Sequence, residues 1–82
     1  MPLFMDEHNL GQVKAADVAG AHKKDLDIQA KHGVKYQRYW VDEAGGKIYC
    51  LVEAPSAEAA IAVHREAHGL VADSIHEVVE GS

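Results

Sequence analysis

The chain has 82 residues, of which 48% are hydrophobic and 26% charged, a composition typical of one small globular domain spanning residues 1–82. Its formal net charge is -5, and no cluster of Lys and Arg could neutralise phosphates, so we expect no nucleic-acid partner. No run approaches the ~18 apolar residues of a membrane span, and the N-terminal segment lacks the basic start of a signal peptide. We therefore expect a cytoplasmic protein with no membrane partner.

Two elements are expected in the first half of the chain. A short apolar and then acidic run predicts a strand over Leu3–His8, because Asn9 and Gly11 follow it as a turn. The segment Lys14–His32 is rich in Ala, Lys and Asp and contains no proline, which predicts a helix. Gly33 then takes the position of a C-terminal stop.

The second half predicts a β-hairpin, a helix and a last strand. β-branched and aromatic residues dominate Val34–Asp42 and Lys47–Glu53, and a glycine-rich turn joins these two runs. Ser56 is a predicted N-cap for a helix that continues to about His68, and residues 74–80 predict the final strand. The order β-α-β-β-α-β indicates an α+β, ferredoxin-like fold, in which both helices lie on one face of a four-stranded antiparallel sheet.

Three of the six histidines fall on helix faces that should point at the sheet. At about 100° per residue, His64 and His68 lie close to the apolar face of the second helix. In the first helix, His22 lies within the predicted inner stripe, which consists of Ala15, Val18, Ala19, Leu26 and Ala30. Histidines spaced i and i+4 can bind one ion from one helix, although the same spacing fits a hydrogen-bonded, partly buried pair.

Further donors lie on the first and third strands, which are central in this fold and lie beneath the helices. Period-two alternation places His8 and Glu7 on opposite faces, and the sequence leaves open which of them faces the helices. On the third strand, Cys50 and Glu53 also take opposite faces. Cys50 fits a metal ligand and, equally, a small buried hydrophobic residue.

The sheet face away from the helices is expected to form a homodimer interface. Both faces of the third strand are apolar enough to be covered, and a chain this short gains from dimerisation because its own core is small. Three aromatic residues of the hairpin are expected to pack there: Tyr36, Tyr39 and Trp40.

The inward donors predict a transition-metal site. Buried imidazoles are costly unless each ring nitrogen has a partner, and a cation satisfies a convergent set of them most simply. Imidazole, thiolate and carboxylate groups together suit nickel, copper or zinc. The candidate ligands are His8, His22, Cys50, Glu53, His64 and His68, with Glu7 as an alternative oxygen donor.

The segments MDEH, KYQRYWVD, YCLVEAPSAEAA and VHREAHGL resemble a family of small bacterial nickel-binding, nickel-responsive proteins, formerly a domain of unknown function. The resemblance covers essentially the whole chain. It implies a ferredoxin-like homodimer that binds Ni²⁺, with histidines and Cys50 or acidic residues near the ions.

We therefore expect a protein that sequesters, buffers or responds to Ni²⁺, with Cu²⁺ and Zn²⁺ as competitors in vitro. The sequence gives no positive sign of catalysis. The alternative hypothesis is a small dimeric monooxygenase or haem-handling enzyme of the same fold, with a pocket lined by His22, Tyr39, Trp40 and His64. A third is a structural or regulatory dimer whose inner histidines are simply hydrogen-bonded.

Overall fold

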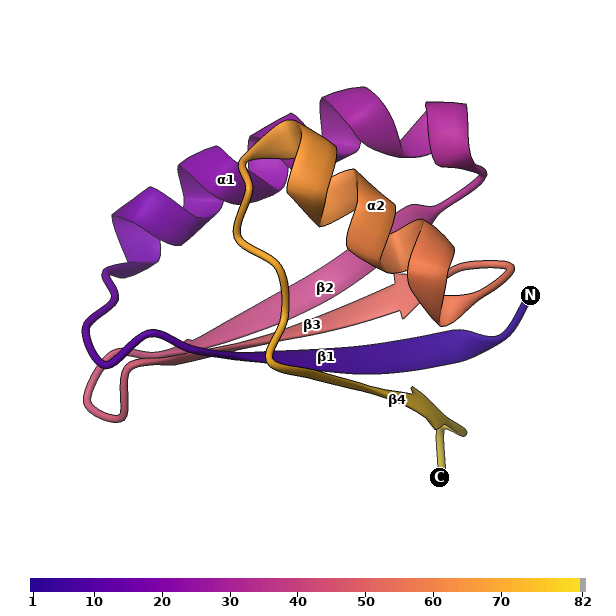
Figure 1. The fold of residues 1–82 in the computed structure, drawn as a ribbon. Helices are drawn as coiled ribbons and strands as arrows, with labels where there is room; N and C mark the ends of the chain where they lie inside the picture. The colour runs from indigo at the N-terminus through magenta and orange to yellow at the C-terminus, as the bar shows by residue number, and fades with distance from the viewer. Residues whose placement is uncertain (82) are drawn as a thin grey trace.

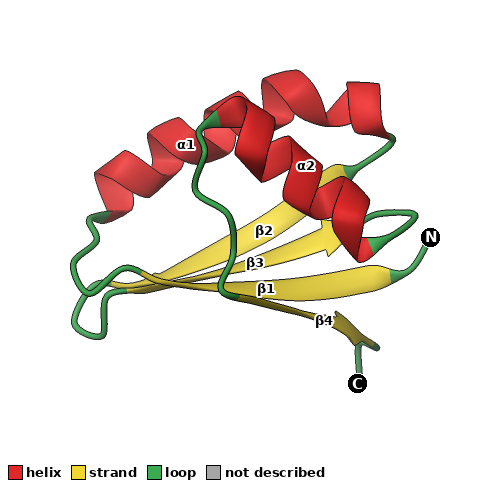
Figure 2. Ribbon diagram, in the orientation of Figure 1, coloured by secondary structure: helices red, strands yellow, loops and turns green. Residues whose placement is uncertain are grey.

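Two helices lie across one face of a four-stranded antiparallel sheet in the computed structural model, which describes residues 1–81 (Figure 1). The elements in chain order are β1 (Leu3–Asn9), α1 (Ala15–Ile28), the 3-10 turn η1 (Gln29–His32), β2 (Lys35–Asp42), β3 (Lys47–Glu53), α2 (Ala57–Ala67) and β4 (Ser74–Val78). This confirms the predicted β-α-β-β-α-β order and the ferredoxin-like arrangement (Figure 2). Within residues 1–81, no helix has the length and apolar character needed to cross a membrane.

The sheet has the strand order β2-β3-β1-β4, so β1 and β3 are central, as predicted, and β4 is an edge strand. β1 pairs with β3 along its full length, from Leu3 opposite Glu53 to Asn9 opposite Lys47. β4 pairs only with β1 and ends at Val78, earlier than the predicted end of the strand. The inward side chains of the two central strands therefore lie directly beneath the helices.

Local capping explains where α2 begins and ends. The Ser56 side chain accepts a hydrogen bond from the backbone N–H of Ala59 at 3.2 Å, which confirms the predicted N-cap of α2. After α2 the chain turns at Gly69, whose φ of +79° favours glycine. α1 ends at Ile28, and the last turn of the predicted first helix is the 3-10 turn η1.

The inner face of α1 differs from the prediction. Of the five residues predicted to point at the sheet, only Val18 is buried, and Leu26 is 45% exposed. The other three are also exposed: Ala15, Ala19 and Ala30. The inner face instead contains Asp25, 2% exposed, because its carboxylate contacts a histidine of α2. A buried polar contact, and not apolar periodicity alone, therefore fixes the rotation of α1.

A β-bulge in β2 changes which aromatic side chains face the helices. The register shifts between Tyr36 and Arg38, so Gln37 is the extra residue of the bulge. Tyr36 and Tyr39 consequently both face the helices, and only Trp40, 47% exposed, lies on the outer face. The prediction that all three aromatic residues pack on the outer face is wrong for the two tyrosines, because strict alternation fails at the bulge.

The core between sheet and helices is mostly apolar, and its innermost residues are fully excluded from solvent: Val52, Ala54, Ala60 and Val63. Four polar side chains lie in the same layer, each at most 2% exposed: Asp6, His8, Asp25 and His64. Charged and polar groups are rarely buried this deeply unless they are paired. The partners of these four side chains therefore define the candidate site.

Candidate metal centre

β1 supplies two of the four buried polar side chains. Its inward residues alternate as Phe4, Asp6 and His8, and Glu7 lies half-buried on the opposite face. His8, and not Glu7, therefore faces the helices, an alternative that the sequence left open. Asp6 was not among the predicted ligands, although a signal for it existed, because strand alternation places it on the same face as His8.

β3 adds Cys50 beside Asp6. The two residues are directly opposite each other in the β1–β3 ladder, and Cys50 is 5% exposed. Burial, and then the charge of Asp6, raise the pKa of the Cys50 thiol well above its usual range. Glu53 lies on the outer face of the strand, where its carboxylate accepts a hydrogen bond from the amide of Gln37. The fold thus brings Cys50 to the cluster and leaves Glu53 outside it.

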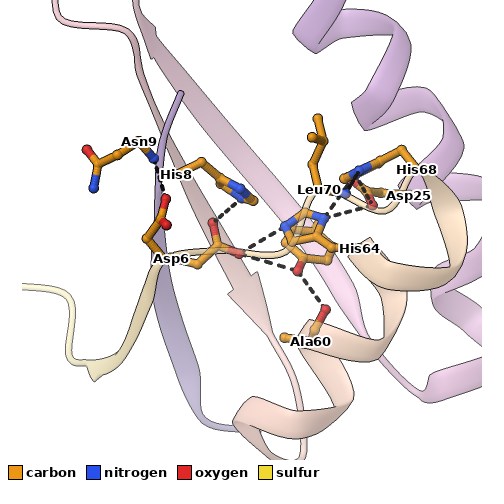
Figure 3. Close-up of polar contacts among 10 residues, drawn as sticks. Asp6, His8, Asn9, Asp25, Ala60, His64, His68 and Leu70 are labelled. Carbon is orange, nitrogen blue, oxygen red and sulfur yellow. Dashed lines mark hydrogen bonds and ion pairs between the residues drawn. The ribbon is translucent and has the colours of Figure 1, made fainter. Parts of the chain in front are cut away.

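His64 of α2 links two carboxylates in the core (Figure 3). Its Nε2 lies 2.9 Å from Oδ2 of Asp6, and its Nδ1 lies 2.9 Å from Oδ1 of Asp25. The ring of Tyr36 packs against the imidazole, with the ring centroids 4.5 Å apart, and the Tyr36 hydroxyl donates to the carbonyl oxygen of Ala60 at 2.9 Å. The imidazole therefore ties α2 to both β1 and α1.

The two carboxylates keep the His64 ring charged. Burial favours the neutral ring, but hydrogen bonds to Asp25 and Asp6 outweigh burial and raise the pKa of His64 from 6.5 to about 9. Burial also opposes ionisation of Asp6, but hydrogen bonds from His64 and His8 outweigh it and lower the pKa of Asp6 from 3.8 to about 2. Without a metal, both ring nitrogens of His64 therefore donate to carboxylates.

His68, at the end of α2, also faces Asp25. Its Nε2 lies 3.0 Å from Oδ1 of Asp25, and the backbone N–H of Leu70 donates to its Nδ1 at 3.1 Å. Because Nδ1 accepts this bond, the hydrogen of the neutral ring lies on Nε2. Burial lowers the pKa of His68, and attraction by Asp25 offsets only part of this effect.

Two overlapping sets of donor atoms are arranged so that an ion could bind, and in each set the donor atoms lie within 4.8 Å of one another. The first donor set is Asp6, His8, Cys50 and His64, and the second donor set is Asp25, His64 and His68. Within residues 1–81, Nδ1 of His8 has no hydrogen-bond partner, and the only polar contact of Oδ1 of Asp6 is with Nε2 of His8, at 3.3 Å. Buried polar atoms without partners are costly, and a coordinated cation would remove that cost. The residues present therefore fit a metal ion.

A cavity of about 20 Å³ adjoins the first donor set, a volume that suits a single water molecule or ion. His22 lines this cavity, but its ring belongs to neither donor set. It packs instead on Tyr39, with the ring centroids 4.6 Å apart. Of the predicted ligands, the fold therefore groups His8, Cys50 and His64, places His68 in the second donor set, and holds His22 nearby.

The structure adds a second carboxylate that the sequence analysis missed. Asp25 lies three residues after His22 on α1, so helical spacing from His22 could have indicated it. The predicted apolar stripe instead favoured Leu26, its exposed neighbour. A charged residue on an inner helix face is recognised only when its partners on another element are known, and those partners are His64 and His68.

Residues 4–78 match the model of a protein family described as "Nickel responsive protein SCO4226-like". The crystal structure of SCO4226 from Streptomyces coelicolor A3(2) is 41% identical in sequence, with a TM-score of 0.90 over 98% of this chain and 99% of that one. None of the curated proteins matches the chain. The matched region includes every residue of both donor sets.

The paired charges predict how the stability of the metal-free protein depends on pH. The contribution of Asp6 and His64 to the free energy of unfolding should be fully present between pH 3.8 and 6.5, the ordinary pKa values of these two residues. It should fall as pH rises from 6.5 to about 9, because only the folded chain still holds the His64 proton. It should also fall as pH drops from 3.8 to about 2, because only the unfolded chain then binds a proton on Asp6.

Urea unfolding in EDTA, followed by the fluorescence of Trp40, measures this dependence. Because the pKa of His64 is raised from 6.5 to about 9, the free energy of unfolding should fall by on the order of 3 kcal/mol across this range. His64→Gln should lose the alkaline decline, whereas the control His32→Ala, which removes a surface imidazole bonded to Glu66, should keep it. If the free energy of unfolding of His64→Gln fell above pH 6.5 as much as that of the wild type, His64 would not be the group responsible for the decline.

Proposed function

Because this chain belongs to the SCO4226-like family of nickel-responsive proteins, we propose that it binds Ni²⁺ in the cytoplasm and sequesters or buffers the ion. The observation that supports this proposal is the first donor set, which gathers beneath the helices four buried side chains that could coordinate an ion: Asp6, His8, Cys50 and His64. Nitrogen, oxygen and sulfur donors in one site suit late first-row metals. Cu²⁺ and Zn²⁺ suit the same donors and are expected to compete in vitro.

The charges in the core favour a cation. The carboxylates of Asp6 and Asp25, with the charged ring of His64 between them, leave one negative charge uncompensated among three buried groups. Buried charge without compensation is costly. A divalent ion that replaces the proton on Nε2 of His64 would bring these three groups to neutrality, and the thiolate of Cys50, once it binds, would leave the site with one negative charge.

Such an ion would also use Oδ1 of Asp6, which otherwise contacts only Nε2 of His8, and one ring nitrogen of His8, whose Nδ1 has no hydrogen-bond partner within residues 1–81. Thiolate and neutral imidazole are the forms that bind metals, so loading requires His64 and Cys50 to lose protons. Binding should therefore release protons and strengthen as pH rises.

We assign the first ion to the first donor set because it offers four donors, including a histidine with an unpartnered ring nitrogen, whereas the second offers three donors that already contact one another. Oδ1 of Asp25 faces both His64 and His68, and Nδ1 of His68 accepts the N–H of Leu70. Binding an ion there first would break these contacts. Carboxylates commonly orient a ligating histidine through its other ring nitrogen. We therefore propose that Asp25, which also contacts His68, orients the ring of His64.

The small cavity favours holding an ion over catalysis on an organic molecule. A space of about 20 Å³ accommodates a water-sized ligand, and a haem or an aromatic substrate does not fit it. The alternative enzyme pocket also required Trp40 beside His64, but Trp40 lies on the opposite face of the sheet. No observation on the helix-facing side therefore favours the monooxygenase or haem-handling hypothesis.

We also propose that the protein forms a homodimer through the outer face of the sheet. Apolar residues line a hollow of about 460 Å³ on this face, among them Leu3, Met5, Trp40 and Leu51. Within residues 1–81, no helix covers this face (Figure 1). The molecule measures 32 × 30 × 19 Å, so its broad face can supply the roughly 800 Å² per partner of a typical interface. A second copy meets it with the same apolar surface, as two-fold symmetry requires.

Trp40→Glu tests the dimer. The wild type should sediment at twice the mass of one chain, and the variant should sediment as a monomer, because dimerisation would bury a carboxylate in an apolar interface. Val71→Glu is the matched control, since Val71 is also exposed and apolar but lies between α2 and β4. A monomeric wild type, or a dimeric Trp40→Glu, in analytical ultracentrifugation would contradict the proposal.

Isothermal titration with Ni²⁺ tests the metal site. Asp6→Asn and His8→Gln each remove a proposed ligand with little change in volume. Each should weaken binding at least about 10- to 100-fold, because mutating a residue that only hydrogen-bonds to a metal ligand already reduces the affinity by that much. His32→Ala, which removes a surface imidazole, should bind as the wild type does. Circular dichroism checks that each variant folds. Equal affinity in all four proteins would rule out the first donor set as the nickel site.

A further inference from the structure

The cavity beside the first donor set has an inner and an outer end. At its inner end lie His8, Cys50 and His64, each at most 5% exposed. At its outer end lie His22 of α1, which is half-buried, and Leu70 of the segment after α2, which is 41% exposed. The cavity therefore leads from the buried donors toward solvent, and His22 is a nitrogen donor at its outer end.

His22 differs from the other histidines that line the cavity. His8, His64 and His68 each contact a carboxylate, whereas within residues 1–81 the ring of His22 takes part in no hydrogen bond or ion pair. The ring is nevertheless held in place, because it packs on Tyr39 at an interplanar angle of 43°. His22 thus presents an oriented imidazole with no competing polar partner.

We propose that His22 is the capture ligand through which a hydrated divalent cation enters the buried site. A cation from solvent must lose its bound water before it reaches donors that are almost fully buried. An imidazole at the outer end replaces one of these water molecules while the rest remain, so desolvation occurs in steps. This inference rests on the proposed nickel binding and assigns His22 to the path of the ion and not to its final coordination.

The two roles have different kinetic signatures. A capture ligand lowers the barrier between solvent and site, so its removal slows association and dissociation together and leaves the dissociation constant unchanged. A final ligand stabilises the bound state, so its removal speeds dissociation and weakens the affinity. Stopped-flow loading and unloading of Ni²⁺, followed by competition with a metallochromic indicator, separates these cases.

His22→Ala and His22→Phe are the informative variants, because Phe keeps a ring against Tyr39 but offers no metal donor. Both should load and unload Ni²⁺ about tenfold more slowly than the wild type, the effect of about 1.4 kcal/mol on the barrier. Their dissociation constants should stay within about twofold of the wild type, a difference well below 1 kcal/mol. His22→Cys, which restores a donor, should recover part of the rate, and His32→Ala should load normally.

Two results would overturn the inference. Unchanged loading rates in His22→Ala and His22→Phe would show that the ion does not pass this residue, and faster dissociation with weakened affinity would make His22 a final ligand. Failure of the proposed function is distinguishable from both. In that case the wild type binds no Ni²⁺, or Asp6→Asn leaves its affinity unchanged.

Discussion

The position of one imidazolium between two buried carboxylates is the constraint on which the rest of the structure depends. His64 reaches Asp6 of β1 through one ring nitrogen and Asp25 of α1 through the other, so three elements meet at one side chain. Removing His64 would leave both buried carboxylates without a positive partner, which costs several kcal/mol. The same contacts set the rotation of both helices over the sheet, because neither carboxylate can reach the ring if its element turns.

This arrangement also explains why the core is prepared for a metal ion. The proton on Nε2 of His64 occupies a position that a divalent ion could take, with Asp6, His8 and Cys50 already gathered around it. The donors are held by the fold before any ion arrives, so little conformational entropy remains to be lost on binding. In the metal-free protein the cost of this preparation is visible at Nδ1 of His8, a buried polar atom that has no hydrogen-bond partner within residues 1–81.

The fold could be predicted from sequence because its signals are local. Alternation marks the strands, Ser56 caps α2, and the glycines after the helices end them. Three features of the site could not be predicted in this way. Period-two alternation does not say which strand face is covered, so His8 and Glu7 remained equivalent. The bulge at Gln37 reverses the faces of β2 without a sequence signal, and burial of Asp25 depends on partners distant in sequence.

Anomalous scattering at the nickel absorption edge, from crystals of the Ni²⁺-loaded protein, tests the central claim most directly. If the buried imidazolium occupies the position of the ion, the strongest anomalous peak should lie among the side chains of Asp6, His8, Cys50 and His64, with the ring of His64 turned little from its present orientation. Strong peaks only at the protein surface, with the bonds from His64 to Asp6 and Asp25 intact, would contradict it.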